Sequence, residues 1–245
     1  MRLRIRFTKL GKVRWTSHRD VARMWERAFR RVGLPLAYSE GFTPRPKVSF
    51  GLALPTGHES MAEYLDVELS DAAAGAPDLV ALKARLSAAL PEGIEVAALC
   101  ELEPGSPSLQ EDVEACSWRW LAVPGEGSLP LSVDDLGKRV AHALAAPALE
   151  VARWRKGRET TVDIRPGIGR LEVVEADGEG VWLDADLAAR PQGVRPADVL
   201  AALGPDLEER HVRRTHQWIV RRGERLEPLG SQGVPQAPHA EARAS

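Results

Sequence analysis

Apolar and polar residues alternate strictly over residues 2–7, at the start of the chain. The odd positions are Leu3, Ile5 and Phe7, and the even positions are all arginine. This period of two predicts a half-buried strand. We expect its arginines to line the open face of a sheet, and these are Arg2, Arg4 and Arg6.

The pattern changes to a helical period after Ser17. Apolar residues recur at intervals of three and four up to residue 32, and Gly33 and Pro35 then end the run. Ser17 with Asp20 resembles a capping box in which Asp replaces the usual Glu. We therefore expect a helix with one buried face. Its opposite face carries a row of arginines, Arg19, Arg23, Arg27 and Arg30, which repel one another unless an anion or carboxylates lie nearby.

The segments that follow complete one folding unit. Pro44 and Pro46 exclude a helix and favour an extended loop. The other expected elements are a turn at 9–12 with a return at 13–15, strands at 48–54, 63–69 and 94–99, and a helix at 77–90. The order strand, helix, strand, strand, helix, strand is the split βαβ, or ferredoxin-like, plan.

The second half of the chain loosely repeats this order. Its expected elements are strands at 118–123, 171–174, 181–183 and 211–219, helices at 133–145 and 196–203, and a hairpin over 149–165 that turns at Lys156 and Gly157. We predict an α+β protein of two tandem ferredoxin-like (split βαβ) units. The expected division is a basic unit at 1–100, an acidic linker at 101–116, a second unit at 117–227 and a disordered tail at 228–245.

Charge is distributed unevenly along the chain. The formal net charge is −2, yet residues 1–60 hold thirteen Lys or Arg against four Asp or Glu. Such a split favours a basic binding face on an otherwise acidic body. The alternative is that the two halves neutralise each other across an internal interface, because charge runs are usually solvated faces.

Several classes of protein lack their sequence signatures here. No run of eighteen apolar residues is present, so no membrane span is expected, and the N-terminus lacks the apolar core of a secretory signal. The two cysteines, Cys100 and Cys116, stand alone, so we expect no metal site and no cofactor, in a reducing, cytoplasmic compartment. Phosphate-binding, dinucleotide-binding and serine-hydrolase motifs are also missing.

The segments SHRD, ERAFRRVGLPLAYSEGF, PRPKVSFGLALPTGHES and AEYLDVEL carry a resemblance to a known family. They are similar to the radical SAM-linked (radical SAM-associated) proteins, whose domain of unknown function stands alone or lies C-terminal to a radical SAM module. The weaker match KGRETTVDIRPGI extends it into the second half. The chain lacks the CxxxCxxC motif of a radical SAM enzyme, so the resemblance implies the stand-alone form with a radical SAM protein as a separate partner.

The architecture of the first segment also resembles the RAMP-type RNA-binding proteins of CRISPR systems, in which a basic helix and a glycine-rich loop hold RNA. This likeness and the charge pattern together favour RNA as the partner. The candidate nucleic-acid-binding residues are Arg2, Arg4, Arg6, Arg14, His18, Arg19, Arg23, Arg27, Arg30, Arg45 and Lys47. Phe42 and Tyr38 either stack on bases or belong to the core.

A second basic cluster accompanies the 149–165 hairpin. Its residues are Arg153, Arg155, Lys156, Arg158 and Arg165, and they extend a binding track if they are exposed. Trp154 lies among them, and in a chain poor in Phe and Tyr we interpret it, like Trp118, Trp120 and Trp182, as a core anchor.

Three functions are compatible with these features. The favoured one is a non-catalytic module that holds RNA for modification or processing by a radical SAM protein. The second is a metal-independent endoribonuclease, in which His18 at a helix start acts as the base; the structural alternative is a histidine that caps or packs there. The third is a protein–protein adaptor for a radical SAM enzyme, without nucleic acid.

Overall fold

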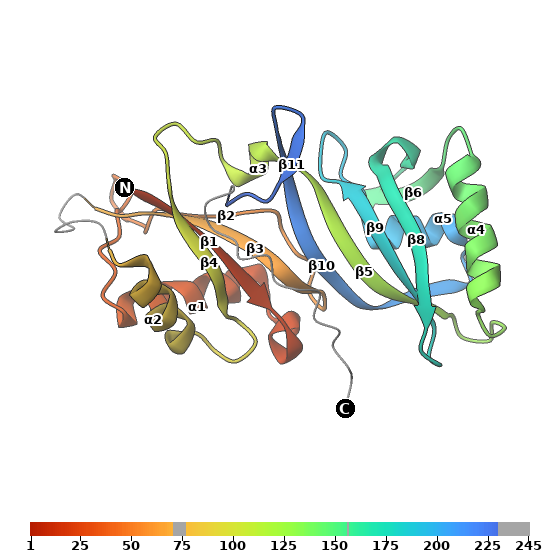
Figure 1. Ribbon diagram of the computed structural model, residues 1–245, viewed down its shortest axis with the longest axis horizontal. Coiled ribbons are helices and arrows are strands. Elements are labelled where there is room, and N and C mark those ends of the chain that lie inside the picture. The colour runs from red at the N-terminus through yellow and green to blue at the C-terminus, as the bar shows by residue number, and fades with distance from the viewer. Residues whose placement is uncertain (71–76, 156, 230–245) are drawn as a thin grey trace.

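The computed structural model describes residues 1–70, 77–155 and 157–229. One long twisted sheet runs through these residues, and its strands follow the order β4-β1-β3-β10-β5-β9-β8 (Figure 1). With β2 paired to β3 and β11 paired to β10, the sheet has nine strands. The predicted α+β class is therefore confirmed.

The first half of the chain forms the predicted split βαβ arrangement. Strand β1 pairs with both β3 and β4, β2 pairs with the other side of β3, and every one of these pairings is antiparallel. The spatial order β4-β1-β3-β2 is that of a ferredoxin-like unit. The elements are β1 (Arg2–Lys9), η1 (Gly11–Trp15), α1 (His18–Arg31), β2 (Val48–Phe50), β3 (Glu59–Glu68), α2 (Leu79–Ala89) and β4 (Val96–Leu102).

The second half repeats the arrangement in the order β10-β5-β9-β8. One addition distinguishes it, a two-stranded hairpin of β6 and β7 inserted after the first helix of the repeat. The elements are α3 (Leu109–Asp112), β5 (Val113–Pro124), α4 (Val133–Ala145), β6 (Glu150–Arg155), β7 (Arg158–Asp163), η2 (Arg165–Gly167), β8 (Ile168–Ala176), β9 (Val181–Ala188), α5 (Pro196–Leu203), β10 (Leu207–Arg221) and β11 (Glu224–Leu226).

A short parallel contact joins the two halves into one sheet. Arg213 and Arg214 of β10 pair with Glu59 and Ser60 at the start of β3. Buried apolar residues form two clusters, one under α1 and α2 and one extending from Tyr64 through the second half. The core thus follows the two repeats, although the sheet is continuous.

Some expected boundaries differ from those observed. Residues 13–15 lie in the 3-10 helix η1 rather than in a return strand. The segment 101–116, expected as a linker, holds the end of β4, the one-turn helix α3 and the start of β5. Of the expected tail, Pro228 and Leu229 are buried, and 230–245 lie outside the described residues. The division into domains stays a prediction.

Helix α1 begins where its sequence indicates. The side chain of Ser17 accepts a hydrogen bond from the backbone N–H of Asp20 at 3.2 Å, which satisfies one of the unpaired donors of the first turn. Val21, Trp25 and Phe29 are buried against the sheet. This packing fixes the rotation of the helix, and therefore where its arginines point.

Candidate nucleic-acid interface

The arginine row of α1 lies on its outer face. Arg19, Arg23, Arg27 and Arg30 are all exposed; we call them the α1 stripe. Arg23 lies 3.7 Å from Asp20. Within the described part of the chain, no acidic side chain forms an ion pair with Arg19, Arg27 or Arg30.

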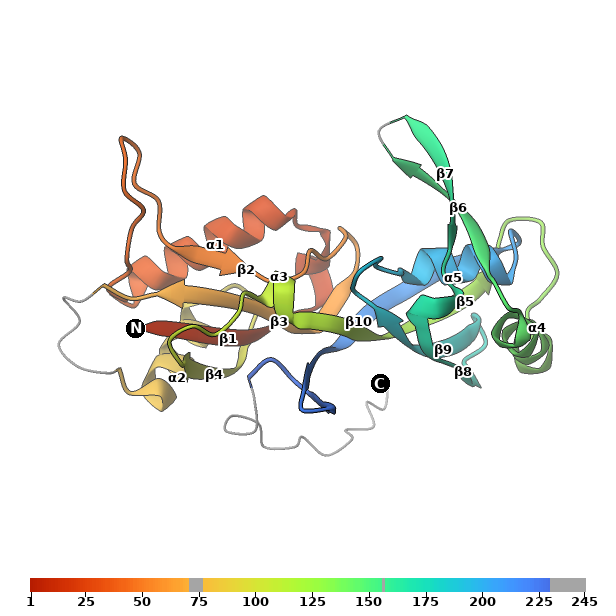
Figure 2. The same ribbon diagram turned by 90° about the horizontal axis from the view of Figure 1, so that it is seen from above.

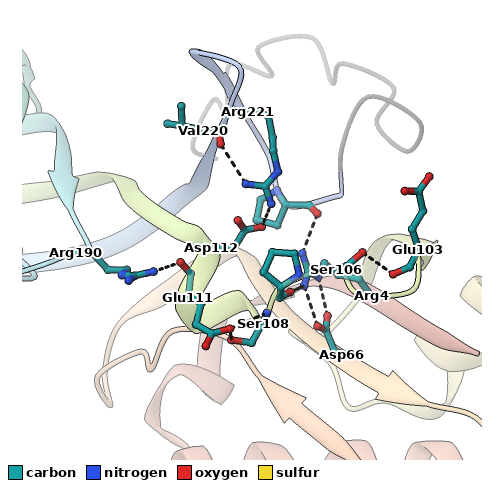
Figure 3. Close-up of polar contacts among 12 residues, drawn as sticks. Arg4, Asp66, Glu103, Ser106, Ser108, Glu111, Asp112, Arg190, Val220 and Arg221 are labelled. Carbon is teal, nitrogen blue, oxygen red and sulfur yellow. Dashed lines mark hydrogen bonds and ion pairs between the residues drawn. The ribbon is translucent and has the colours of Figure 1, made fainter.

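The expectation that the arginines of β1 line an open face is wrong. Arg4 is buried and forms a two-pronged pair with its cross-strand partner Asp66, at 2.7 and 2.9 Å (Figure 3). It also donates to the carbonyls of Pro107 and Pro228, each at 3.2 Å. The chain segments that follow β4 and β11 cover this face of the sheet, so Arg4 holds the fold together.

Two further candidate nucleic-acid-binding residues, Arg6 and Arg14, form ion pairs within the protein. Arg6 donates to Glu227 at 2.7 Å, and both side chains are mostly buried. Arg14 is half-buried and lies 3.4 Å from Glu59, which also accepts from Arg213 at 2.6 Å. The pair of Arg6 with Glu227 joins the two halves of the chain, as the alternative explanation of the charge asymmetry expected, whereas Arg14 and Glu59 both belong to residues 1–60.

Arg2, Arg45 and Lys47, by contrast, meet at one cleft of about 400 Å³. Arg2 comes from β1, and the other two come from the loop between α1 and β2. Three serines, Ser39, Ser49 and Ser108, and the carboxylates of Asp66 and Glu68 complete the polar lining. The structure therefore brings Arg2 together with two basic residues that lie more than forty positions later in the sequence.

The loop that carries Arg45 is a narrow arm. Tyr38 and Pro46 face each other across it, the N–H of Ser39 donates to the carbonyl of Arg45 at 2.9 Å, and the N–H of Arg45 donates back to Ser39 Oγ at 3.1 Å. Phe42 at its tip is fully exposed, and Tyr38 is 53% exposed. Neither aromatic residue belongs to the core, which leaves both open to stacking.

Two members of the second basic cluster, Arg153 and Arg165, form contacts that hold the fold together. Arg153 donates to Asp198 at 2.7 Å and to the carbonyl of Gly193 at 2.8 Å, and this ties the β6–β7 hairpin to the start of α5. Arg165 donates to the carbonyl of Leu144 at the end of α4, at 2.8 Å. Arg158 is exposed. Lys156 and the side chain of Arg155 lie outside the described residues.

Trp154 differs from its interpretation as a core anchor. It is 73% exposed on the β6–β7 hairpin, whereas Trp118 and Trp120 are buried as expected. Figure 2 shows the reason, because this hairpin and the arm between α1 and β2 both stand clear of the sheet, on the same side in that view. A residue at the free end of such a hairpin has no core to join.

His18 is exposed at the first position of α1. Its ring meets that of Phe50 edge-on, with centroids 5.1 Å apart. It borders a cavity of about 20 Å³ with Lys9 and Glu63, which is room for one water. The structure thus places His18 as a packing residue with an open edge.

Two charged residues, Lys9 and Glu63, line this cavity with His18, and both already form hydrogen bonds within the protein. Lys9 donates to the carbonyls of Arg14 and Thr16, at 3.2 and 3.1 Å, and burial lowers the pKa of its ammonium group. Glu63 accepts from the buried Arg214. Neither group is positioned as the acid that a cleavage reaction pairs with a histidine base.

The described residues contain neither a metal-binding cluster nor a helix suited to cross a membrane. Among them, no group of three or more His, Cys, Asp or Glu side chains is arranged to hold a metal ion. Cys116 is buried in the core, which raises the pKa of its thiol. In the same residues, no helix is both long and apolar enough to span a bilayer.

Comparison with known proteins gives a family but no reaction. A family model described as an uncharacterized protein conserved in bacteria (DUF2344) matches residues 2–196. No curated protein matches the chain significantly.

Two solved structures show a low-level similarity. One is a Cbf5-Nop10-Gar1 complex, with a TM-score of 0.47 and 14% identity over 88% of this chain and 48% of that chain. The other is an H/ACA RNP bound to a substrate RNA containing 2′-deoxyuridine, with a TM-score of 0.46 and 14% identity over 88% and 47% of the two chains. The chain thus spans about half the length of the solved chains it matches.

Proposed function

The chain belongs to this family of uncharacterized bacterial proteins, and we propose that it is a non-catalytic module that binds RNA through the α1 stripe and the arm beside it. The observation that carries the proposal is the contrast between the arginines of the α1 stripe and those in the rest of the protein. The arginines outside the stripe are largely paired with carboxylates, such as Arg4 with Asp66 and Arg214 with Glu63. The stripe instead gathers like charge on one helix face, which is unfavourable unless an external anion neutralises it.

The geometry of the stripe favours a polymeric anion over a folded acidic partner. Its residues follow one another at intervals of four, four and three positions, which is a cation about every 6 Å along the helix axis. A nucleic-acid strand carries regularly repeated phosphates and can match such a row. An acidic protein would need a row of carboxylates at the same spacing.

The test is direct binding of labelled RNA by protein that has been washed at high salt to remove bound nucleic acid. We expect binding at low salt, with an affinity that falls steeply as salt rises, because phosphate contacts release counterions. Polyglutamate serves as the matched anionic polymer without phosphates. Binding of polyglutamate without binding of RNA would reject the proposal and support the adaptor function.

A radical SAM protein is the partner that we propose for this RNA-bound form. The support is the resemblance of the segments around residues 16–69 to the radical SAM-linked proteins. The sequence lacks the CxxxCxxC motif of a radical SAM enzyme, so the radical SAM protein would be a separate chain. The module would present RNA in the cytoplasm to a separate enzyme that modifies or processes it.

The competing ribonuclease function is tested by His18→Ala. We expect that neither wild-type protein nor the variant cuts structured RNA in metal-free buffer, because Lys9 and Glu63, which line the cavity beside His18, already form hydrogen bonds within the protein and neither is positioned as the acid for the leaving 5′-oxygen. We also expect unchanged RNA affinity. A denaturing gel measures cleavage. Discrete products from the wild type that are absent with His18→Ala would replace this proposal with the enzymatic one, whereas products shared by both proteins indicate a contaminant.

A further inference from the structure

The cleft beside the arm is built from five separate parts of the chain. Arg2 comes from β1, Ser39 and Arg45 from the arm, Ser49 from β2, Asp66 and Glu68 from β3, and Ser108 from the N-cap of α3. Its volume of about 400 Å³ lies within the range of sites for small organic ligands, roughly 300–1,000 Å³. The cleft is therefore large enough for a nucleotide and larger than a bare phosphate needs.

The acidic residues that border the cleft are already neutralised. Asp66 is bound by Arg4 on both carboxylate oxygens, and Glu68 lies 3.0 Å from Lys47. Arg2 donates one N–H to the carbonyl of Ser106 and keeps its full charge. Arg45 is exposed, and its side chain forms no hydrogen bond or ion pair within the described residues. The net charge facing the cleft is therefore positive.

The arm holds Arg45 in a defined place. Pro44 and Pro46 flank it, and proline restricts the backbone of the residue before it. The hydrogen bonds between Ser39 and Arg45 close the arm, and Lys47 N–H donates to the carbonyl of Ala37 at 2.8 Å. These contacts fix the backbone of Arg45, so phosphate binding has to order only its side chain, whose paired N–H groups match phosphate oxygens.

We propose that this cleft binds one phosphorylated nucleotide, with the phosphate between Arg2 and Arg45 and the serine hydroxyl groups around the sugar and base. The inference rests on the proposed function, because it assigns the cleft to one nucleotide of the RNA that the α1 stripe holds. It also goes further, since a site of this size and charge binds a free mononucleotide on its own.

The test is isothermal titration of the full chain with adenosine 5′-monophosphate, adenosine and inorganic phosphate. We expect the monophosphate to bind at least about tenfold more tightly than either of the others, because only it fills the cleft and pairs with both arginines. Arg45→Gln should weaken this binding about tenfold, and Arg2→Gln should do so to a similar degree. Both changes remove the positive charge and keep a shorter polar side chain, and the side chain of Arg45 forms no hydrogen bond or ion pair with the described residues that folding could depend on.

The control separates this inference from the proposed function. A variant of the α1 stripe, Arg19→Gln with Arg23→Gln, should bind adenosine 5′-monophosphate like the wild type while its affinity for long RNA falls. Equal binding of phosphate and the monophosphate would overturn the nucleotide site, and so would unchanged binding by Arg45→Gln. Tighter binding of a phosphoserine peptide than of the nucleotide would also overturn it. None of these results affects the loss of RNA binding by the stripe variant.

Discussion

Replacing Arg4 with methionine is expected to lower the free energy of unfolding by about 3–5 kcal/mol, since it leaves a buried carboxylate without its partner. Asp66 is only 5% exposed and receives two hydrogen bonds from Arg4. The same guanidinium also holds the carbonyls of Pro107 and Pro228, so its loss loosens both segments that cover this face of the sheet. Urea unfolding followed by tryptophan fluorescence measures the change.

A matched surface pair gives the control for this prediction. Arg170 is exposed on β8 and lies 2.9 Å from Glu172 and 3.6 Å from Asp186, which keeps a closer pair with Arg225 at 2.7 Å, so Arg170→Gln should cost less than about 1 kcal/mol. If Arg4→Met were as stable as Arg170→Gln, Arg4 would not be the structural clamp described above. In that event Arg4 would again be a candidate RNA-binding residue.

Replacing all four stripe residues with glutamine is expected to weaken RNA binding on the order of 100-fold at low salt, because each lost cation removes one phosphate contact. The four side chains are exposed on the outer face of α1, so the fold should survive the change. Fluorescence anisotropy of a labelled RNA measures the affinity, and circular dichroism checks that the helix remains.

The control for the stripe variant has the same loss of charge elsewhere on the surface. Lys83, Lys138, Arg210 and Arg222 are exposed and lie outside α1 and the arm. Their joint replacement by glutamine should change RNA affinity less than about threefold, because only the long-range field of the molecule is altered. Equal losses in the two variants would show that net charge, and not the stripe, attracts RNA.

The helical pattern of α1 and the alternating pattern of β1 differ in how well they predict the exposure of their arginines. On α1, the apolar face is packed on the sheet, and in a two-layer unit the opposite face of a helix is left to solvent. The predicted exposure of Arg19 and Arg30 is therefore confirmed. On β1, alternation assigns Arg4 correctly to the second face of the sheet. It does not reveal that residues about a hundred and two hundred positions later cover that face.

The order of elements was enough to predict both split βαβ units. It did not predict that β10 would join β3 through two parallel pairs, because nothing in the local sequence records a contact between Glu59 and Arg213. The cleft was missed for the same reason. Arg45 was a candidate from its own loop, but Arg2 and Ser108 become its neighbours only after folding.

Trp154 shows the limit of an argument from composition. Scarce aromatic residues usually anchor cores, and Trp120 does so. The turn that places Trp154 on a free hairpin was predicted at Lys156 and Gly157, with β6 and β7 on either side. The error came from assuming that a predicted hairpin packs on the sheet. Its two strands instead form a sheet of their own.

The salt dependence of RNA binding tests the central proposal most directly. For a single-stranded RNA, the logarithm of the affinity should fall with the logarithm of salt concentration by about 0.7 for each phosphate contact. We predict that the quadruple glutamine variant of the α1 stripe has a slope shallower than that of the wild type by about 2.8, and that the charge-matched control keeps the wild-type slope. A quadruple variant with the wild-type slope would contradict the proposal, since the phosphates would then be bound by other residues.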